Sequence, residues 1–236
     1  MAWDFEELKV LVENKHGAGQ SNLLDPLLNS LWRKLEIARY HSIESRRLTE
    51  QYFGDDSFEN YNKAFRYIFD RINGDEEARK FFQDAFIAEA NIVAYSQSMH
   101  SAFDILGKVI IESLKIDHMF HANQNIYLFT VKNKLKHHGI ANNIVTEIET
   151  AINNDSYKYL RAFVNVNKHL CLLRIPHTVE MNAASEIPFG MKIEPFLYEN
   201  EHFQEKWARY FVTEEFNEIS ESIVKIGNSI NDHLKI

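Results

Sequence analysis

Hydrophobic residues recur every three or four positions over most of this chain, which is the spacing of helices that bury one face. The run over residues 75–116 is long enough to be one helix or a pair broken near Ser98 or Gly107. The segments with this pattern are 21–52, 54–74, 75–116, 126–138, 142–153, 155–173 and 213–234. They predict a mainly α-helical fold, a bundle of long helices.

Residues that favour helix ends lie at the edges of these segments. Pro26, after an aspartate, is expected at the first position of the first long helix. Asp56 is placed to begin the second segment and Gly74 to end it. Gly139 is expected to end the helix over 126–138, and the carboxylate of Asp155 to cap the last helix before the pattern changes.

The pattern changes after Arg174, where apolar and polar residues alternate and Pro and Gly become frequent. Alternation with such breakers is typical of strands and turns, so a small β-hairpin or irregular insertion is expected near residues 175–200. The length favours one domain over residues 1–236. We expect residues 1–20 to be an N-terminal extension, linked flexibly to the first long helix, and 175–205 to be the β-type insertion.

Composition narrows the class of protein. Hydrophobic residues make up 45% of the chain, enough for a folded core, and Cys171 is the single cysteine. Because Cys171 stands between two leucines, we expect a buried, inert thiol rather than a nucleophile. The sequence begins with no targeting segment and has no long apolar run, which favours a cytoplasmic protein without membrane association.

Charge is unevenly distributed. The net charge of -8 argues against broad duplex binding, yet residues 132–177 carry +4. The basic residues of this stretch are Lys132, Lys134, Lys136, Lys158, Arg161, Lys168 and Arg174. The stretch is either a site for a small anion or single strand, or an ordinary solvated face.

Motifs for metals and cofactors are missing from the sequence. His118 and His121 lie one helical turn apart without a clear third ligand, and His137 and His138 point to different helix faces. No glycine-rich phosphate loop or nucleophile elbow occurs. We therefore expect no cofactor and no metal.

A dense polar row occurs on the helix over 155–173. Arg161, Asn165 and His169 are spaced at i, i+4 and i+8, so they lie along one face. Arginine binds phosphate through its planar fork, and histidine transfers protons near neutral pH. These groups suit metal-independent attack of a ribose 2′-hydroxyl on the adjacent phosphate. The alternative is a buried structural row paired with acidic residues such as Glu89 or Asp104.

The segment "DSYKYLRAFVNVNKHLCLL" resembles the signature helix of HEPN-like domains, the nucleotide-binding helical bundles of prokaryotic defence and stress systems. The resemblance implies a homodimer whose signature helices face each other, an association with RNA or a nucleotide, and an antitoxin-type protein partner. In active members the same arrangement makes a metal-independent ribonuclease. By this resemblance, Arg161 and His169 are the catalytic pair. The substrate-binding residues would be Asn165, Asn167, Lys168 and Arg174.

The spacing of the pair departs from that of the family. Seven residues lie between Arg161 and His169, more than is usual in active members, and Ala162 follows the arginine where a polar residue is usual. Two hypotheses therefore stand. One is an RNA- or nucleotide-associated protein, with or without activity as a metal-independent ribonuclease of a defence or toxin-antitoxin system. The other is a non-catalytic helical binding or scaffold module in which the Arg/Asn/His row is structural.

Overall fold

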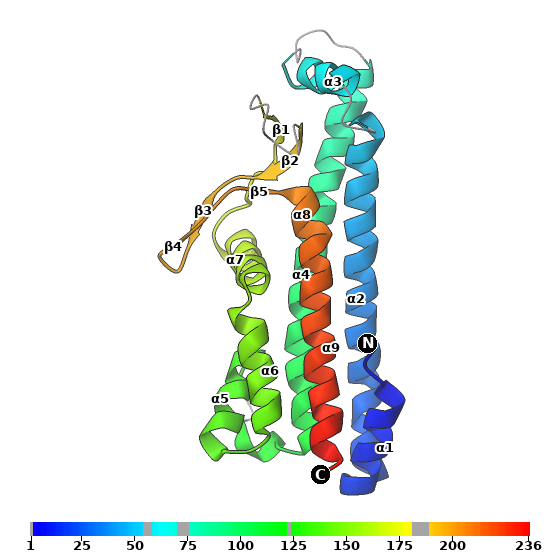
Figure 1. The fold of residues 1–236 in the computed structure, drawn as a ribbon, viewed down its shortest axis with the longest axis vertical. Helices are drawn as coiled ribbons and strands as arrows, with labels where there is room; N and C mark the ends of the chain where they lie inside the picture. Colours follow the sequence, from blue (N-terminus) through cyan, green and yellow to red (C-terminus); the bar gives the residue numbers. More distant parts are fainter. Residues whose placement is uncertain (1, 54–57, 70–75, 122–123, 181–188) are drawn as a thin grey trace. The chain divides into compact units, whose positions relative to one another are not determined.

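The protein is mainly helical with a small β region, which confirms the predicted fold class (Figure 1). The computed structural model describes residues 2–53, 58–69, 76–121, 124–180 and 189–236. Its helices are α1 (Phe5–His16), α2 (Ala18–Phe53), α3 (Phe58–Phe69), α4 (Glu76–Leu114), α5 (Leu128–His138), α6 (Asn142–Asn153), α7 (Asp155–His169), α8 (Ala208–Val212) and α9 (Glu214–Leu234), with a 3₁₀ turn at Asp117–Met119.

The predicted helix ends are confirmed in part. The periodic run over 75–116 forms one continuous helix, α4, unbroken at Ser98 and Gly107. Gly139 ends α5 with φ 64°, a left-handed conformation that suits glycine, and its N–H donates to carbonyls of the last turn. Asp56 and Gly74, predicted to begin and end the second segment, lie outside the described residues.

The predicted flexible link before the first long helix is wrong, because α2 begins at Ala18 and only Gly17, at φ 91°, separates it from α1. The residues expected to form an N-terminal extension contain α1. Pro26 lies inside α2 instead of at its first position. Because proline has no N–H, one bond of the helical ladder is missing there. Ser30 Oγ donates to the carbonyl of Pro26 at 2.6 Å one turn later.

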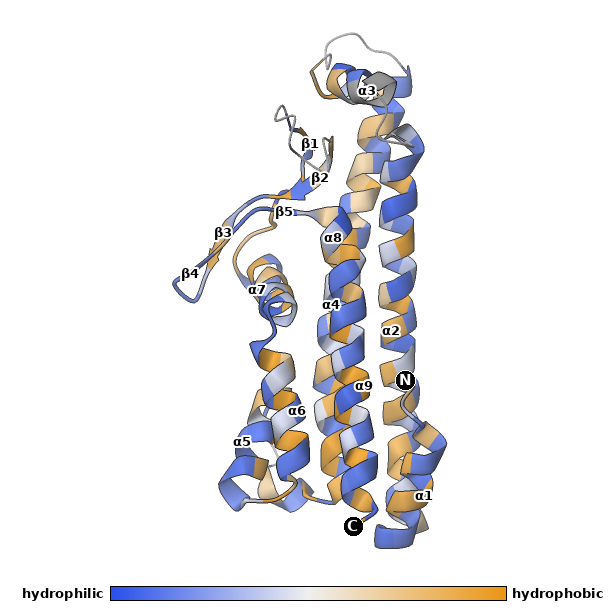
Figure 2. Cartoon of the chain, viewed as in Figure 1, coloured by the Kyte–Doolittle hydropathy of each residue, from blue (hydrophilic) through white to orange (hydrophobic). Residues whose placement is uncertain are grey.

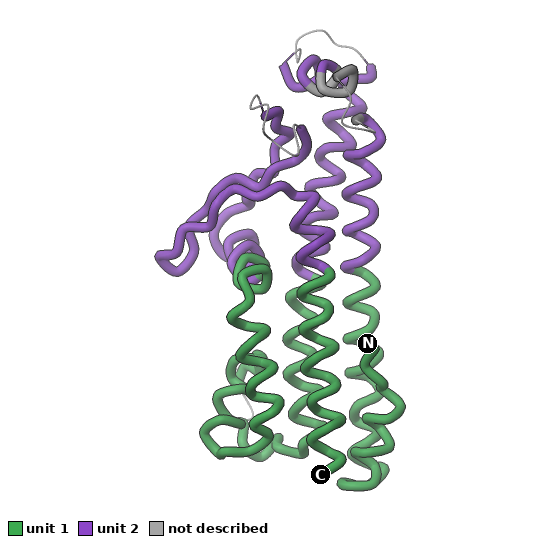
Figure 3. The backbone as a smooth tube through the Cα atoms, viewed as in Figure 1, with its two compact units in different colours: residues 1–37, 98–160, 217–236 green, residues 38–97, 161–216 purple. Residues whose placement is uncertain are grey.

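The chain divides into two compact units (Figure 3). Each of the helices α2, α4, α7 and α9 has residues in both units. Unit 1 contains residues 1–37, 98–160 and 217–236, and unit 2 contains residues 38–97 and 161–216. The expectation of a single domain over 1–236 stays a prediction.

Unit 1 is held together by apolar helix faces and by contacts of the N-terminal segment with α9. Figure 2 shows hydrophobic and hydrophilic bands alternating along α9, and the buried residues of that helix include Ile219, Ile223 and Ile226. Trp3 Nε1 donates to Asn231 Oδ1 at 3.2 Å. A Cβ added at Gly227 would lie 2.0 Å from the Trp3 ring, so only glycine fits this approach.

Unit 2 has an aromatic core. The Tyr95 ring lies 5.4 Å from that of Phe211, and Phe163 of α7 lies 5.2 Å from Phe211. Tyr95 is buried, and its hydroxyl donates to the carbonyl of Phe211 at 3.0 Å. Burial raises the pKa of the Tyr95 phenol well above its ordinary value.

Two small antiparallel sheets follow α7 within unit 2. Strands β1 (His177–Val179), β2 (Phe189–Ile193) and β5 (Lys206–Trp207) form one sheet in the order β1-β2-β5. Strands β3 (Phe196–Tyr198) and β4 (Glu201–Phe203) form a hairpin. Its turn residues Glu199 and Asn200 have φ 51° and 65°. Positive φ at both positions matches the twist of a two-residue hairpin turn. The strands together confirm the predicted small β insertion in a mainly helical fold.

Candidate functional site

Helix α7 turns its apolar side inward and its polar row outward. Leu160, Ala162 and Phe163 are buried, whereas Arg161 and His169 are exposed and Asn165 is half-buried. The N-terminal cap is Asn154, whose Oδ1 accepts hydrogen bonds from two backbone N–H groups of the first turn. The prediction that Asp155 caps α7 is therefore wrong by one residue.

Arg161 is held by a carboxylate of the β3–β4 turn. Its Nη2 lies 2.9 Å from both Oε1 and Oε2 of Glu199, and its guanidinium carbon lies 5.7 Å from the centre of the Tyr198 ring. Burial and a hydrogen bond with Glu199 raise the pKa of Tyr198, and the charge of Arg161 opposes that shift. The carboxylate partner thus comes from the hairpin turn, whereas the structural alternative had named Glu89 or Asp104.

The two asparagines of the row support the helix backbone. Asn165 Nδ2 donates to the carbonyl of Arg161 at 2.9 Å. Asn167 Nδ2 donates to the carbonyl of Phe163 at 2.8 Å, and its Oδ1 accepts from the backbone N–H of Leu173 at 2.9 Å. Asn167 therefore ties the chain that leaves α7 to the last turn of the helix, a role that the substrate-binding prediction did not contain.

The C-terminal end of α7 carries a second exposed part of the row. Lys168 and His169 are exposed, and within the described residues neither makes a side-chain hydrogen bond or ion pair. Arg174 is also exposed, and its Nη1 lies 3.8 Å from Glu194 Oε1, too far for a close ion pair. Burial raises the pKa of Glu89 on α4, and the positive charge of Arg174 partly offsets this.

Cys171 is exposed, so the expectation of a buried thiol is wrong. The helix ends at His169, and the following turn presents Leu170 and Leu172 outward, with 69% and 64% of their surface exposed. Because the helix has already ended, its periodicity no longer places Cys171 on the buried face of α7.

Geometry limits what one copy of α7 can do chemically. Eight residues along a helix span about 12 Å, so Arg161 and His169 are far apart on their shared face. A phosphate bound to Arg161 in the place of Glu199 would therefore lie far from the imidazole of His169. In one copy of the chain, Arg161 pairs with Glu199, and Lys168 and His169 lie together at the end of the helix.

The predicted basic stretch is divided between the two units. Lys132, Lys134 and Lys136 lie on α5 in unit 1, whereas Lys168 and Arg174 belong to unit 2. Lys136 Nζ donates to Glu149 Oε1 of α6 at 2.7 Å, and this bond lowers the pKa of Glu149.

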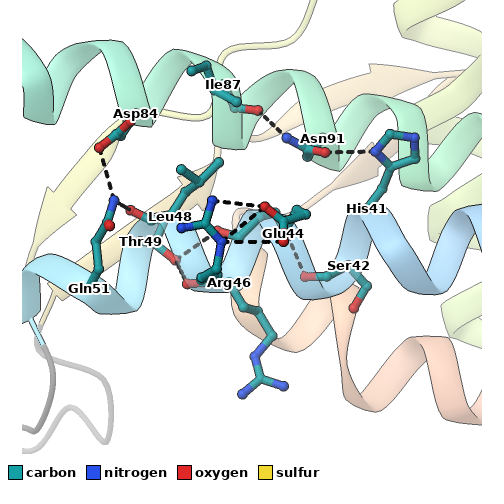
Figure 4. A network of polar contacts seen from close by, with 12 residues as sticks. His41, Ser42, Glu44, Arg46, Leu48, Thr49, Gln51, Asp84, Ile87 and Asn91 are labelled. Carbon is teal, nitrogen blue, oxygen red and sulfur yellow. Dashed lines mark hydrogen bonds and ion pairs between the residues drawn. The ribbon is translucent and has the colours of Figure 1, made fainter.

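A polar network between α2 and α4 in unit 2 was not predicted from the sequence (Figure 4). His41 Nδ1 lies 2.7 Å from Asn91 Oδ1, and Asn91 Nδ2 donates to the carbonyl of Ile87 at 2.8 Å. Asp84 accepts from Gln51 Nε2 at 2.9 Å and from the Tyr52 hydroxyl. Because these partners satisfy one another, the network fits a structural role.

Metal ligands, membrane spans and known relatives add no further assignment. Within the described residues, no three His, Cys, Asp or Glu side chains are grouped to hold a metal ion. No helix of the described part has the length and apolar character needed to cross a membrane. In comparisons with known proteins, no family model, no curated protein and no solved structure matches the chain. The HEPN-like resemblance therefore rests on the residues of α7.

Proposed function

We propose that this chain is a non-catalytic, HEPN-like binding module for RNA or a nucleotide. In this proposal Arg161, Asn165 and Asn167 support the structure of unit 2. Lys168, His169 and Arg174 form the surface that contacts the ligand.

The pair between Arg161 and Glu199 carries the proposal. Cleavage of RNA next to a 2′-hydroxyl requires a cation that stabilises charge developing on the phosphate. A guanidinium already neutralised by a carboxylate is a poor phosphate ligand, because the phosphate must first displace that carboxylate. The helix end has no such obstacle, since Lys168 and His169 are exposed and, among the described residues, unpaired.

The charges at the helix end fit an anionic ligand. Lysine contacts phosphate as a point charge and arginine through its fork, and a neutral or protonated imidazole can donate to a phosphate oxygen. The exposed leucines beside these groups, Leu170 and Leu172, add an apolar surface against which a base can pack.

A metal-independent ribonuclease is the second candidate, favoured by the exposure of His169. A proton-transferring group must be able to reach its substrate, and His169 meets this requirement. In this reading a second copy would supply the phosphate-binding cation, because Arg161 of the same copy is held by Glu199. The homodimer implied by the resemblance belongs to this proposal, and light scattering should then give about twice the chain mass of 27.7 kDa.

The test uses wild-type protein and a short single-stranded RNA with a fluorophore at each end. Anisotropy measures binding, and a gel of the same samples, with chelator present, measures cleavage. We expect saturable binding, intact RNA, and weaker binding by His169→Ala with its melting temperature nearly unchanged. Cleavage of RNA by wild type that disappears in His169→Ala would support the ribonuclease and contradict the non-catalytic binding module. Loss of stability in His169→Ala without binding of RNA or a mononucleotide by wild type would reject both.

A further inference from the structure

Helix α5 buries one face and leaves the opposite face open. Leu128, Val131 and Leu135 are buried. A Cβ added at Gly107 of α4 would lie 3.5 Å from the Leu128 nitrogen and from Val131 Cγ2, so the buried face of α5 contacts α4 there. Both helix segments belong to unit 1.

The open face of α5 combines an aromatic ring with cations. Phe129 has 55% of its surface exposed, although large aromatic side chains are usually well buried. Tyr127, the N-cap residue before the helix, has 48% of its surface exposed. Lys132 Nζ lies 4.5 Å from the centre of the Phe129 ring. Phe129, Lys132 and Lys136 are spaced at i, i+3 and i+7, so they form one row along the helix.

The charge of this face is positive on an otherwise acidic chain. The described helix α5 contains three lysines and no acidic residue. The carboxylate beside it is Glu149 of α6, which binds Lys136 and whose pKa is lowered by Lys136 and, more weakly, by Lys132. In the row itself, Lys132 and Lys136 stand against this one carboxylate, which leaves the row with a net positive charge.

We propose that the open face of α5 binds single-stranded nucleic acid. Lys132 would contact a backbone phosphate, and Phe129 would stack against a base. Lys136 would contribute less, because a phosphate must first displace its partner Glu149. Exposed aromatic rings interleaved with lysines are the features by which proteins bind single strands without sequence preference. A purely acidic peptide would satisfy the lysines and leave the rings unused. The inference goes beyond the proposed function, because α5 lies in the other unit and does not depend on Lys168, His169 or Arg174.

The charge test compares two double variants in binding to a fluorescent single-stranded RNA at low salt. Lys132→Gln with Lys136→Gln should weaken binding by at least about tenfold, and should reduce the slope of log affinity against log salt by about 0.7 for Lys132 alone and by up to about 1.4 if Lys136 also contacts a phosphate. The control, Lys108→Gln with Lys225→Gln, removes the same charge elsewhere in unit 1, and it too includes one lysine paired with a glutamate. Equal losses in the two proteins would overturn the proposal.

The stacking test uses Phe129→Leu, which keeps apolar bulk but removes the aromatic face. We expect affinity for the single strand to fall by about fivefold or more, and affinity for a duplex of the same length to be unchanged. Phe86→Leu on α4, a ring with 70% of its surface exposed in unit 2, is the control and should bind like wild type. A fluorescent polyglutamate peptide bound as tightly as RNA, with no effect of Phe129→Leu on either, would identify a general polyanion surface and overturn the proposal.

Glu149→Gln gives a test with the opposite sign. Removing the carboxylate frees Lys136 and should strengthen binding of the single strand by a few fold. Unchanged or weaker binding, with an unchanged melting temperature, counts against the role of Lys136. If wild type binds no single-stranded RNA at all, the inference fails. Binding of a mononucleotide that is sensitive to Lys168→Gln would then still support the proposed function of α7.

Discussion

Helices α7 and α5 carry similar residue types, and they differ in what those residues contact. On α7, Arg161 is held by Glu199, and Asn167 holds the carbonyl of Phe163 and the N–H of Leu173. On α5, Phe129 is exposed, Lys132 Nζ lies over its ring, and Lys136 is paired with Glu149. Arg161 and the two asparagines of the α7 row are thus bonded within the fold, whereas α5 keeps an exposed ring beside Lys132, for which the described residues provide no ion pair.

The difference shows that availability, more than residue type, separates a site from a structural row. A group held within the fold should cost stability when it is removed, and should change ligand binding little. An exposed group should do the reverse. This contrast can be tested one residue at a time.

The largest expected effect concerns His177, a histidine committed to the fold of unit 2. Its ring lies 4.5 Å from that of Phe81 and its Nε2 atom is shielded from solvent, although part of the side chain reaches the surface. Burial lowers the pKa of His177 from 6.5 to about 4. As pH falls below 6.5, the imidazole is protonated in the unfolded chain before it is protonated in the folded protein. The contribution of His177 to the free energy of unfolding is therefore complete above pH 6.5 and is lost as the pH falls towards 4.

The loss attributable to His177 should reach up to about 3 kcal/mol at pH 4. Urea unfolding of wild type and His177→Gln at a series of pH values measures it, because the difference between the two curves isolates this residue. Parallel curves between pH 7 and pH 4 would show that His177 is not held in its neutral form.

The next effect concerns Asn167. Replacing it with alanine removes two hydrogen bonds and leaves the N–H of the buried residue Leu173 without its acceptor, which should cost about 1–2 kcal/mol of unfolding free energy. The matched change on the exposed face of α5, Asn133→Ala, should cost less than about 0.5 kcal/mol. Urea midpoints of the two proteins test the contrast, and equal costs would remove the distinction between the helices.

A smaller effect is expected for Arg161→Gln. The ion pair with Glu199 is exposed, so its loss should cost about 0.5–1 kcal/mol and should speed amide hydrogen exchange in the β3–β4 hairpin. Lys132→Gln on α5 should leave both stability and the exchange pattern of its surroundings unchanged. Unaltered exchange over Phe196–Phe203 in Arg161→Gln would mean that Arg161 does not hold the hairpin.

Local sequence patterns predicted most of the helices because these depend on residues a few positions apart. They did not predict α1 or α8, and they left open whether the polar row of α7 is exposed or buried. The glycine end of α5 follows from the preference of glycine for positive φ, whereas the apolar spacing of α4 allowed either one helix or two. The interior position of Pro26 does not follow from local preference, since packing along α2 outweighs the missing hydrogen bond.

The partners of the candidate residues could not be predicted in the same way. Glu199 lies 38 positions after Arg161, and it reaches the guanidinium through a hairpin turn whose geometry is not local to α7. The exposure of Cys171 depends on where α7 ends. The lysines of α5 were visible as part of a basic stretch, but the exposure of Phe129 beside them depends on which face packs against α4.

The most direct test of the account compares two single charge removals on the same helix. Affinity for a single-stranded RNA is measured for Arg161→Gln and for Lys168→Gln, with wild type as reference and folding checked by melting temperature. Because Arg161 is held by Glu199 and Lys168 is exposed, we predict that Lys168→Gln weakens binding severalfold and that Arg161→Gln binds nearly as wild type. The opposite order, with Arg161→Gln the weaker binder and Lys168→Gln unaffected, would contradict the account.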